Sequence, residues 1–287
     1  MKEFYDELNK LFKYDPGNRG LLKFVPDADL GKLSEELASA ERVIVVTGFP
    51  ILSKGKGETD GPSGALNIAR ALKISGKEVC LATDECNYEI VRQTAQAANL
   101  SVNTYNIPAE NSEEHCLKLI EEFSPSHVIA IERPGKINGT FRNMNGHIID
   151  HLVSDTDSLL MCKNTVTIAV GDGGNELGMG NLKEYAMEAG VAFADTNCDY
   201  PLVAGISNWW GWGIAALISL NMGENILPSY EEEESYLKAM LSAGAIDGIN
   251  HEPQMSVDGI SFEDNAKFMM EIHKLVDSAL NRKNAGK

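Results

Sequence analysis

Six short runs rich in β-branched residues recur along this chain, with helical patterns between most of them. Most of the runs are continuously apolar, which is typical of parallel strands covered on both faces. The alternation predicts an α/β protein with an open, mostly parallel sheet. The expected strands are RVIVVTG (42–48), EVCLATD (78–84), SVNTYNI (101–107), HVIAIER (127–133), TVTIAVGD (165–172) and VAFAD (191–195).

Helical patterns occupy residues 64–75, 87–98, 112–123 and 175–189, and several begin with Asn or Ser as an N-cap. We therefore expect a Rossmann-like three-layer fold with helices on both faces of the sheet. Two small appendages accompany it: a helical N-terminal segment over residues 1–40, and a C-terminal α+β part in which MSVDGISFEDN (255–265) forms a hairpin turn and starts a capped helix. The run EEEE (231–234) fits the solvated first turn of a helix.

Charge and cysteine content narrow the function classes. The 287 residues carry a formal net charge of −17, which would repel nucleic acid and anionic lipid. The five cysteines are widely spaced and form no C-x-x-C pair, so we expect neither a disulfide framework nor a zinc site. The N-terminus has neither the apolar core of a signal peptide nor the Arg-rich character of a transit peptide. We expect a cytoplasmic protein.

One segment is long and apolar enough to raise the question of a membrane. Pro201 to Met222 contains no charged residue over a length close to that of a bilayer span. No basic flank orients it, so we expect a buried helix, preceded by a turn that holds Ser207 and Asn208, and no membrane span.

Acidic residues follow the expected strands. Ligands of open parallel sheets bind beyond the carboxyl ends of the strands, where the loops converge. A single acid there is most simply a helix N-cap or a solvated residue, but so many carboxylates at one edge need cations or protons to stay together. We expect a divalent ion, Mn²⁺ or Mg²⁺, because such ions take oxygen ligands. The candidate metal ligands are Glu58, Asp60, Asp84, Glu132, Asp172 and Glu176, and Asp195 and Asp199 follow the sixth expected strand.

GDGGNELGMG (171–180) is unusually rich in glycine. It lacks the spacing of a dinucleotide-binding fingerprint, and GKGETDGPSGA (55–65) does not match a P-loop, so neither predicts a nucleotide site. Gly173, Gly174 and Asn175 could bring backbone N–H groups close to an anionic ligand. A tight strand-to-helix turn is the alternative.

Six motifs, in order and from about residue 42 onward, resemble the C-terminal domain of the D-glutamate cyclase family. They are TGFP, ETDGPSGA, AIERPG, HLVSDTD, VGDGGNELGMG and VAGISNWWGWG. The resemblance implies cyclisation of D-glutamate to 5-oxo-D-proline with loss of water, and a cyclase-like domain over residues 41–287. It places all eight acids named above within the acidic motifs of the family. Larger mitochondrial members carry a further N-terminal domain where this chain has residues 1–40.

Lactam formation needs an electrophilic γ-carboxylate and a proton acceptor for the ammonium group. We expect a bound divalent ion to polarise the carboxylate and one of the clustered acids to act as the base, with Arg133 or the GDGGN backbone binding the α-carboxylate. The expected catalytic residues are Asp60, Glu132, Asp172 and Arg133. The same acids suit a Mn²⁺- or Mg²⁺-dependent phosphatase of small phosphate esters, or a non-enzymatic binder of a small anion, and self-association stays open.

Overall fold

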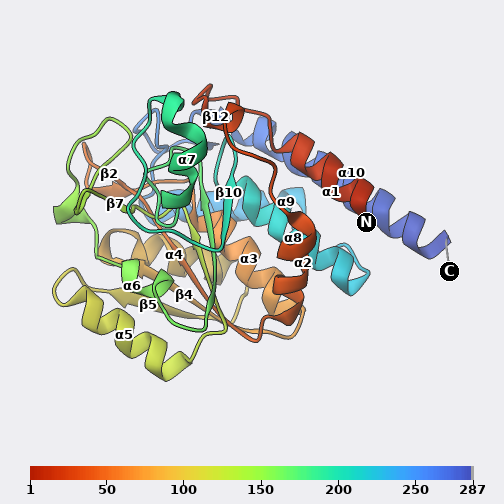
Figure 1. Ribbon diagram of the computed structural model, residues 1–287, viewed down its shortest axis with the longest axis horizontal. Helices are drawn as coiled ribbons and strands as arrows, with labels where there is room; N and C mark the ends of the chain where they lie inside the picture. The colour runs from red at the N-terminus through yellow and green to blue at the C-terminus, as the bar shows by residue number, and fades with distance from the viewer. Residues whose placement is uncertain (286–287) are drawn as a thin grey trace.

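The computed structural model describes residues 1–285 and places six parallel strands in the order β10-β9-β6-β1-β4-β5 (Figure 1). The central strand β1 pairs with β4 on one side and with β6 on the other. All six carboxyl ends therefore lie along one edge of the sheet, which confirms the expected α/β fold class. The strands are β1 (Arg42–Thr47), β4 (Glu78–Asp84), β5 (Asn103–Ile107), β6 (His127–Ile131), β9 (Val166–Gly171) and β10 (Tyr200–Val203).

Helices cover both faces of the sheet. Val43 and Val45 of β1 pack in one core with α3 (Pro62–Ile74), α4 (Glu85–Ala97) and α8 (Trp209–Met222). Ile44 and Val46 pack in a second core with α5 (Ser112–Phe123) and α6 (Asp157–Leu160). In Figure 1, α5 lies on one side of the strands and α3 and α8 on the other. Because both faces are buried, the strand is apolar at consecutive positions.

The two ends of the chain form the expected appendages. The N-terminal segment contains, in chain order, α1 (Lys2–Leu11), the short η1 (Leu21–Lys23) and α2 (Leu30–Ser39). Helix α1 lies beside the last helix, α10 (Phe262–Ala285) (Figure 1). A hairpin of β11 (Ser256–Val257) and β12 (Ile260–Ser261) precedes α10. Phe4 and Leu8 of α1 belong to the larger of the two cores, so the N-terminal segment packs against the α/β body.

The prediction of the sixth strand is wrong. Residues 191–195 form no strand; Phe193 is buried by packing, and the Ala194 N–H donates to the Gly174 carbonyl at 2.9 Å. The sixth strand is β10, and its residues 201–203 fall in the segment 201–222, where we expected only a turn and a helix. The strand has four residues, and only residues 204–208 separate it from α8, so the sequence reads as one uncharged, mostly apolar stretch.

The predicted helix at 175–189 is also mostly wrong. The segment holds three short pieces, η3 (Gly180–Leu182), α7 (Lys183–Ala186) and η4 (Met187–Ala189). Gly178 has φ +94°, and a Cβ there would lie 2.4 Å from the Cβ of Ala169. The chain therefore approaches β9 too closely at this point for a regular helix to form.

The remaining elements are short hairpins and turns near the ends of the strands. β2 (Pro50–Ile51) pairs with β3 (Lys56–Gly57), β7 (Lys136–Ile137) pairs with β8 (Thr140–Phe141), and η2 spans Asp150–Leu152. From Trp209 to Leu220, α8 is buried, as expected for this apolar segment. Within residues 1–285, the search for helices with the length and apolarity of a bilayer span found none.

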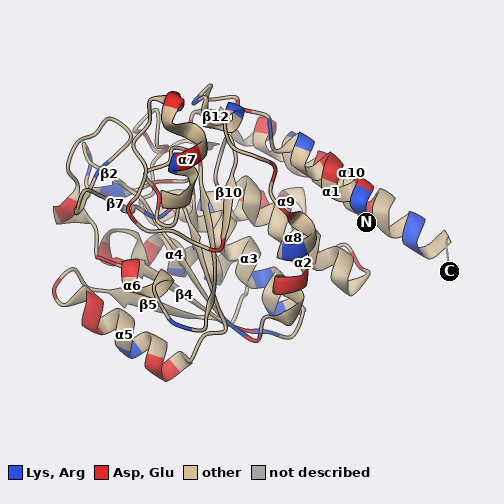
Figure 2. Cartoon of the chain, in the orientation of Figure 1, with Lys and Arg blue, Asp and Glu red and all other residues tan. Residues whose placement is uncertain are grey.

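Charged residues are distributed over several elements. Figure 2 shows both signs of charge along α5 and along α10. The acidic run 231–234 lies in the first turns of α9 (Tyr230–Ser242), where Ser229 and Glu232 form a capping box. The run is not fully solvated as expected, because Glu233 is only 4% exposed.

Candidate active site

Three buried carboxylates meet at the carboxyl ends of β6 and β9, which are neighbours in the sheet. Glu132 follows β6, Asp172 follows β9, and Asp60 lies in the turn that leads into α3. One carboxylate oxygen from each residue lies within 4.8 Å of the other two, and each residue is at most 5% exposed. This three-acid cluster can hold one hard cation.

Backbone N–H groups orient the carboxylate of Asp60. Its Oδ1 accepts from the N–H groups of Gly61 and Asn208 at 3.0 and 2.7 Å, and its Oδ2 accepts from the Ser207 N–H at 3.0 Å. The Asn208 side chain in turn accepts from the N–H groups of Gly61 and Gly64, each at 2.8 Å. The turn at 207–208 thus fixes both Asp60 and the start of α3.

Glu132 has an unusual backbone conformation. Its φ of 42° lies in the left-handed region, which is costly for residues other than glycine. The Ser207 hydroxyl donates to Glu132 Oε2 at 2.5 Å, and the Gly48 N–H donates to the Glu132 carbonyl at 3.1 Å. These contacts hold the residue in one arrangement. Backbone strain that the surroundings enforce in this way is typical of functional sites.

Asp172 contacts a residue from the N-terminal segment. Its Oδ1 accepts a hydrogen bond from Arg19, and the same guanidinium also pairs with Asp258 in the β11–β12 turn. Burial opposes the charge on Arg19, but the surrounding carboxylates, Asp172 and Asp258 foremost, together outweigh it and raise the pKa of Arg19. Asp172 Oδ2 is buried and has no hydrogen-bond partner among residues 1–285. One oxygen of Asp172 is therefore available to a cation.

A cavity of about 640 Å³, which we call the acid cavity, adjoins the cluster. Glu58, Glu132, Glu176 and Asp258 contribute to its wall, together with Arg19. A Cβ on Gly248 would lie 2.3 Å from Glu58 Oε2 and 2.8 Å from Asp258 Oδ1, so the chain passes directly beside both carboxylates. The cavity is large enough for a small molecule.

Burial raises the pKa of four acids at this site. At Glu58 and Glu132, repulsion from neighbouring carboxylates adds to the effect of burial, whereas at Asp172 the charge of Arg19 opposes it. Burial likewise raises the pKa of Asp60 to about 8, although hydrogen bonds from the backbone lower it. Without a cation, Asp60 therefore favours the protonated form near neutral pH.

Glu176 closes the glycine-rich turn on itself. Its Oε1 accepts from the Gly173 N–H at 2.7 Å and from the Asp172 N–H at 3.3 Å, and its Oε2 accepts from the Gly174 N–H at 2.7 Å. Asn175 uses its side-chain N–H to bond the Arg142 carbonyl at 3.0 Å. The backbone N–H groups of Gly173 and Gly174, which were expected to bind an anionic ligand, are thus already occupied by a carboxylate of the chain.

Asp84 and Arg133 form a buried ion pair, with 2.5 Å between Asp84 Oδ2 and the guanidinium. Arg133 also donates to the carbonyls of Gly48 and Ser154 and to the hydroxyl of Thr156. Asp84 does not join the three-acid cluster. The pair instead connects the ends of β4 and β6 to the loop before α6.

Asp195 and Asp199 lie away from the cluster. Asp195 accepts from the N–H groups of Asn138 and Gly139 in the turn between β7 and β8, at 3.1 and 3.0 Å. Asp199 accepts from the N–H and hydroxyl of Thr167, each at 2.8 Å, near the start of β9. Because the sixth strand follows these residues instead of preceding them, Asp199 lies at the amino edge of the sheet.

Three residues of the site were not predicted: Arg19, Ser207 as a partner of Glu132, and Asp258. Arg19 lies in a loop between two helices, and Asp258 lies in a hairpin turn, so neither follows a strand of the main sheet. The turn SVDGIS was recognised, but nothing in its pattern indicated where Asp258 would point.

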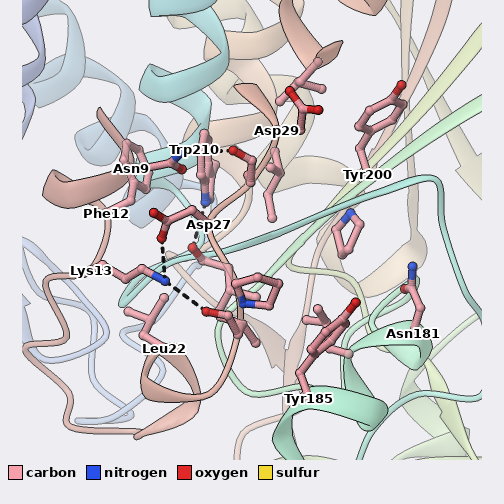
Figure 3. A pocket seen from close by; sticks show the side chains of 18 of the residues that line it. Asn9, Phe12, Lys13, Leu22, Asp27, Asp29, Asn181, Tyr185, Tyr200 and Trp210 are labelled. Atoms are coloured by element: carbon pink, nitrogen blue, oxygen red, sulfur yellow. Dashed lines mark hydrogen bonds and ion pairs between the residues drawn. The ribbon is translucent and has the colours of Figure 1, made fainter. Parts of the chain in front are cut away.

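A second cavity, of about 610 Å³, lies between α1, the loop before α2 and β10 (Figure 3). Figure 3 shows Lys13 bound to Asp27 at 3.0 Å, and Lys13 also donates to the Val25 carbonyl at 3.0 Å. Lys32 pairs with Asp29 at 3.5 Å. Both lysines of this second cavity are thus paired with aspartates of its wall, whereas the acid cavity has more buried carboxylates than lysine or arginine side chains.

Comparisons with known proteins identify the family of this chain. The family described as "D-glutamate cyclase-like, C-terminal" has a sequence model that matches residues 8–273. The D-glutamate cyclase, mitochondrial, of Homo sapiens is 29% identical over 316 aligned positions, which cover 94% of this chain and 51% of the human protein. The chain thus spans about half the length of that curated relative. The resemblance expected from the motifs is confirmed, and the chain belongs to the D-glutamate cyclase-like family.

Proposed function

We propose that this protein is a lyase that converts D-glutamate to 5-oxo-D-proline and water with the help of a divalent ion. The observation that carries the proposal is the three-acid cluster beside the acid cavity, in a chain of the D-glutamate cyclase-like family. The human relative is named for a cyclase of D-glutamate, which supports the same substrate. The mitochondrial location in that name bears on the human protein, and a cytoplasmic location for this chain stays a prediction.

Asp60, Glu132 and Asp172 are the residues proposed to hold Mn²⁺ or Mg²⁺. Their spacing, their burial and the unpartnered Asp172 Oδ2 support this assignment. When bound, the ion would polarise the γ-carboxylate of the substrate as a Lewis acid. The contacts of Asp60 and Glu132 with the 207–208 turn would keep the ligands in place. Asp84, paired with Arg133, is left out of this ligand set.

Glu58 is proposed to move the protons. It lies in the wall of the acid cavity, and burial and the neighbouring carboxylates raise its pKa, which favours a group that can accept a proton. In the reaction, the amine nitrogen forms a bond to the γ-carboxyl carbon, and one carboxyl oxygen leaves. The ammonium group loses two protons, and both end on the departing oxygen as water. Glu58 would carry them from nitrogen to oxygen.

A substrate comparison tests the proposal. Purified protein reconstituted with Mn²⁺ is assayed on D-glutamate, on L-glutamate and on a panel of small phosphate esters. The proposal expects 5-oxo-D-proline from D-glutamate, a slower reaction or none with the L-enantiomer, and no release of phosphate. Phosphate release alone would support the metal-dependent phosphatase, and turnover of no compound would support a non-enzymatic binder.

A further inference from the structure

Arg19 supplies the positive charge in the wall of the acid cavity. Among the described residues that line this cavity, it is the only lysine or arginine. Its side chain is 16% exposed, and it contacts the carboxylates of Asp172 and Asp258. A guanidinium has five N–H donors, and these contacts engage two of its nitrogens. Donors therefore remain for a ligand in the cavity.

The loop that carries Arg19 is built to hold it in position. Both oxygens of Asp15 accept from the loop backbone, Oδ1 from the Arg19 N–H at 3.1 Å and Oδ2 from the Gly20 N–H at 2.9 Å. A Cβ on Gly205 would lie 2.6 Å from the Tyr14 carbonyl oxygen, so the start of the loop packs tightly against the turn after β10. The guanidinium is thus held by its own loop as well as by its two ion pairs, which lowers the entropic cost of binding a ligand.

The other anion-binding groups near the site are occupied. Glu176 accepts from the backbone N–H groups of the glycine-rich turn. Arg133 is fully buried and bonded to Asp84, to two carbonyls and to a hydroxyl. Beside the clustered carboxylates, an anionic group that enters the acid cavity would meet repulsion, and Arg19 is the lysine or arginine of the described wall that can offset it.

We propose that Arg19 binds the α-carboxylate of the substrate and thereby selects α-amino acids over simple amines. This inference rests on the proposed function, since it assumes an amino acid substrate. A guanidinium matches a carboxylate with two parallel hydrogen bonds, which fixes direction as well as position. The ammonium group, on the next carbon, then faces the acidic residues of the cavity. Arg19 would thus orient the amine toward the groups that take its protons.

Two matched ligands that cannot cyclise test this role. D-2-Aminopentanoate has the amine and the α-carboxylate but no γ-carboxylate, and butylamine is the same molecule without the α-carboxylate. Binding of each is measured by calorimetry with the Mn²⁺-loaded wild type, with Arg19→Gln, and with Arg92→Gln as a control. Arg92 is a surface residue of α4 that pairs with Glu89 and does not line the cavity.

Wild type and Arg92→Gln should bind the amino acid about tenfold to a hundredfold more tightly than the amine, and Arg19→Gln should bind both alike. Arg19→Gln should bind Mn²⁺ at least as tightly as wild type, because a neighbouring positive charge is removed; this also shows that the variant is folded. Arg19→Lys keeps the positive charge but not the paired N–H donors of the guanidinium, so its preference for the amino acid over the amine should be weaker than that of wild type.

The inference would be overturned if Arg19→Gln preferred D-2-aminopentanoate to butylamine as strongly as wild type does, or if wild type showed no such preference. These outcomes are separate from failure of the proposed function, which shows as no turnover of D-glutamate. If the protein does not cyclise D-glutamate but still prefers the amino acid to the amine through Arg19, the proposed function fails and the amino acid site at Arg19 stands.

Discussion

The two carboxylate oxygens of Asp172 have different surroundings, because Arg19 contacts Oδ1 and Oδ2 is buried without a partner in residues 1–285. We expect Asp172→Asn to bind Mn²⁺ at least about tenfold more weakly than wild type, since it removes a charged ligand. Burial raises the pKa of Asp172, so the metal-free variant should be as stable as wild type or more stable. Calorimetric titration with Mn²⁺ and melting temperatures in chelator measure the two effects.

The matched control is Asp199→Asn, which removes an equivalent charge near the amino end of β9, where Asp199 contacts Thr167. It should leave Mn²⁺ binding unchanged. Equal Mn²⁺ affinities of wild type and Asp172→Asn would contradict the assignment of Asp172 as a ligand.

Glu233 predicts a pH dependence of stability outside the site. Burial raises its pKa to about 7, although hydrogen bonds from Trp212 and Asn67 lower it. The folded state therefore holds the proton more tightly than the unfolded state, and the resulting stability is full below about pH 4.5 and is lost as the pH rises to about 7.

Replacement of Glu233 by Gln removes this loss of stability at higher pH. Relative to wild type, Glu233→Gln should gain roughly 2–4 kcal/mol in the free energy of unfolding between pH 4.5 and pH 8. Urea unfolding at the two pH values measures the gain. The neighbouring exposed Glu231→Gln is the control and should follow wild type at both. Parallel pH profiles for Glu233→Gln and wild type would refute the prediction.

At the level of single residues, the sequence predicts the members of the site that follow strands. Glu132 and Asp172 could be placed because parallel strands deliver their carboxyl ends to one edge. Arg19 could not, because it lies 153 positions before Asp172 and reaches it only through the packing of the N-terminal segment. The hydrogen-bond partners of Glu176 and Arg133 could not be predicted either, because a sequence motif does not show which neighbouring groups already bond its polar atoms.

Helices α3 and α8 cross with almost no space between their backbones. A Cβ on Gly211 would lie 2.5 Å from the Cα of Gly64. Because backbone atoms cannot move aside, we expect Gly211→Ala to lower the free energy of unfolding by about 2 kcal/mol or more. The same crossing holds Asn208 beside Gly61 and Gly64, so the variant should also bind Mn²⁺ more weakly.

The control for this prediction is Gly31→Ala in α2. A Cβ at Gly31 would have ordinary contacts, at 3.5 Å from Asp29 and 3.8 Å from Tyr5. This variant should be stabilised by about 0.5–1 kcal/mol, the usual gain in helix propensity. Urea midpoints compare the two, and a Gly211→Ala midpoint equal to that of wild type would mean that the crossing tolerates a methyl group.

At the level of elements, long periodic segments were predicted well and short ones were not. Five of the strands were located: four are apolar runs bounded by polar residues or turns, and β5, which is largely polar, follows from its β-branched and aromatic residues. The prediction of the sixth strand was wrong for two reasons. The real strand, β10, has only four residues and lies shortly before the apolar helix α8. The sequence VAFAD has the composition of a strand, but its apolar side chains pack in a loop. The glycines of 175–189 shaped the path of that segment more strongly than its helical periodicity did.

The whole molecule brings its site together from three regions. The α/β body supplies Asp60, Glu132 and Asp172, the N-terminal segment supplies Arg19, and the C-terminal hairpin supplies Asp258. The fold class could be predicted from the alternation of strand and helix patterns in the sequence. The meeting of these three regions at one site depends on tertiary packing, which no local pattern encodes. The division of the chain into residues 1–40 and 41–287 stays a prediction, although Arg19 gives the first segment a direct part in the site.

Formation of 5-oxo-D-proline from D-glutamate, followed by NMR, tests the central claim most directly. Three samples are compared: Mn²⁺-loaded wild type, wild type in chelator, and Mn²⁺-supplemented Glu132→Gln, which keeps the size of the side chain and removes its charge. The account predicts steady product formation in the first sample and a loss of about a hundredfold or more in the other two. No product from Mn²⁺-loaded wild type, or equal rates in all three samples, would contradict it.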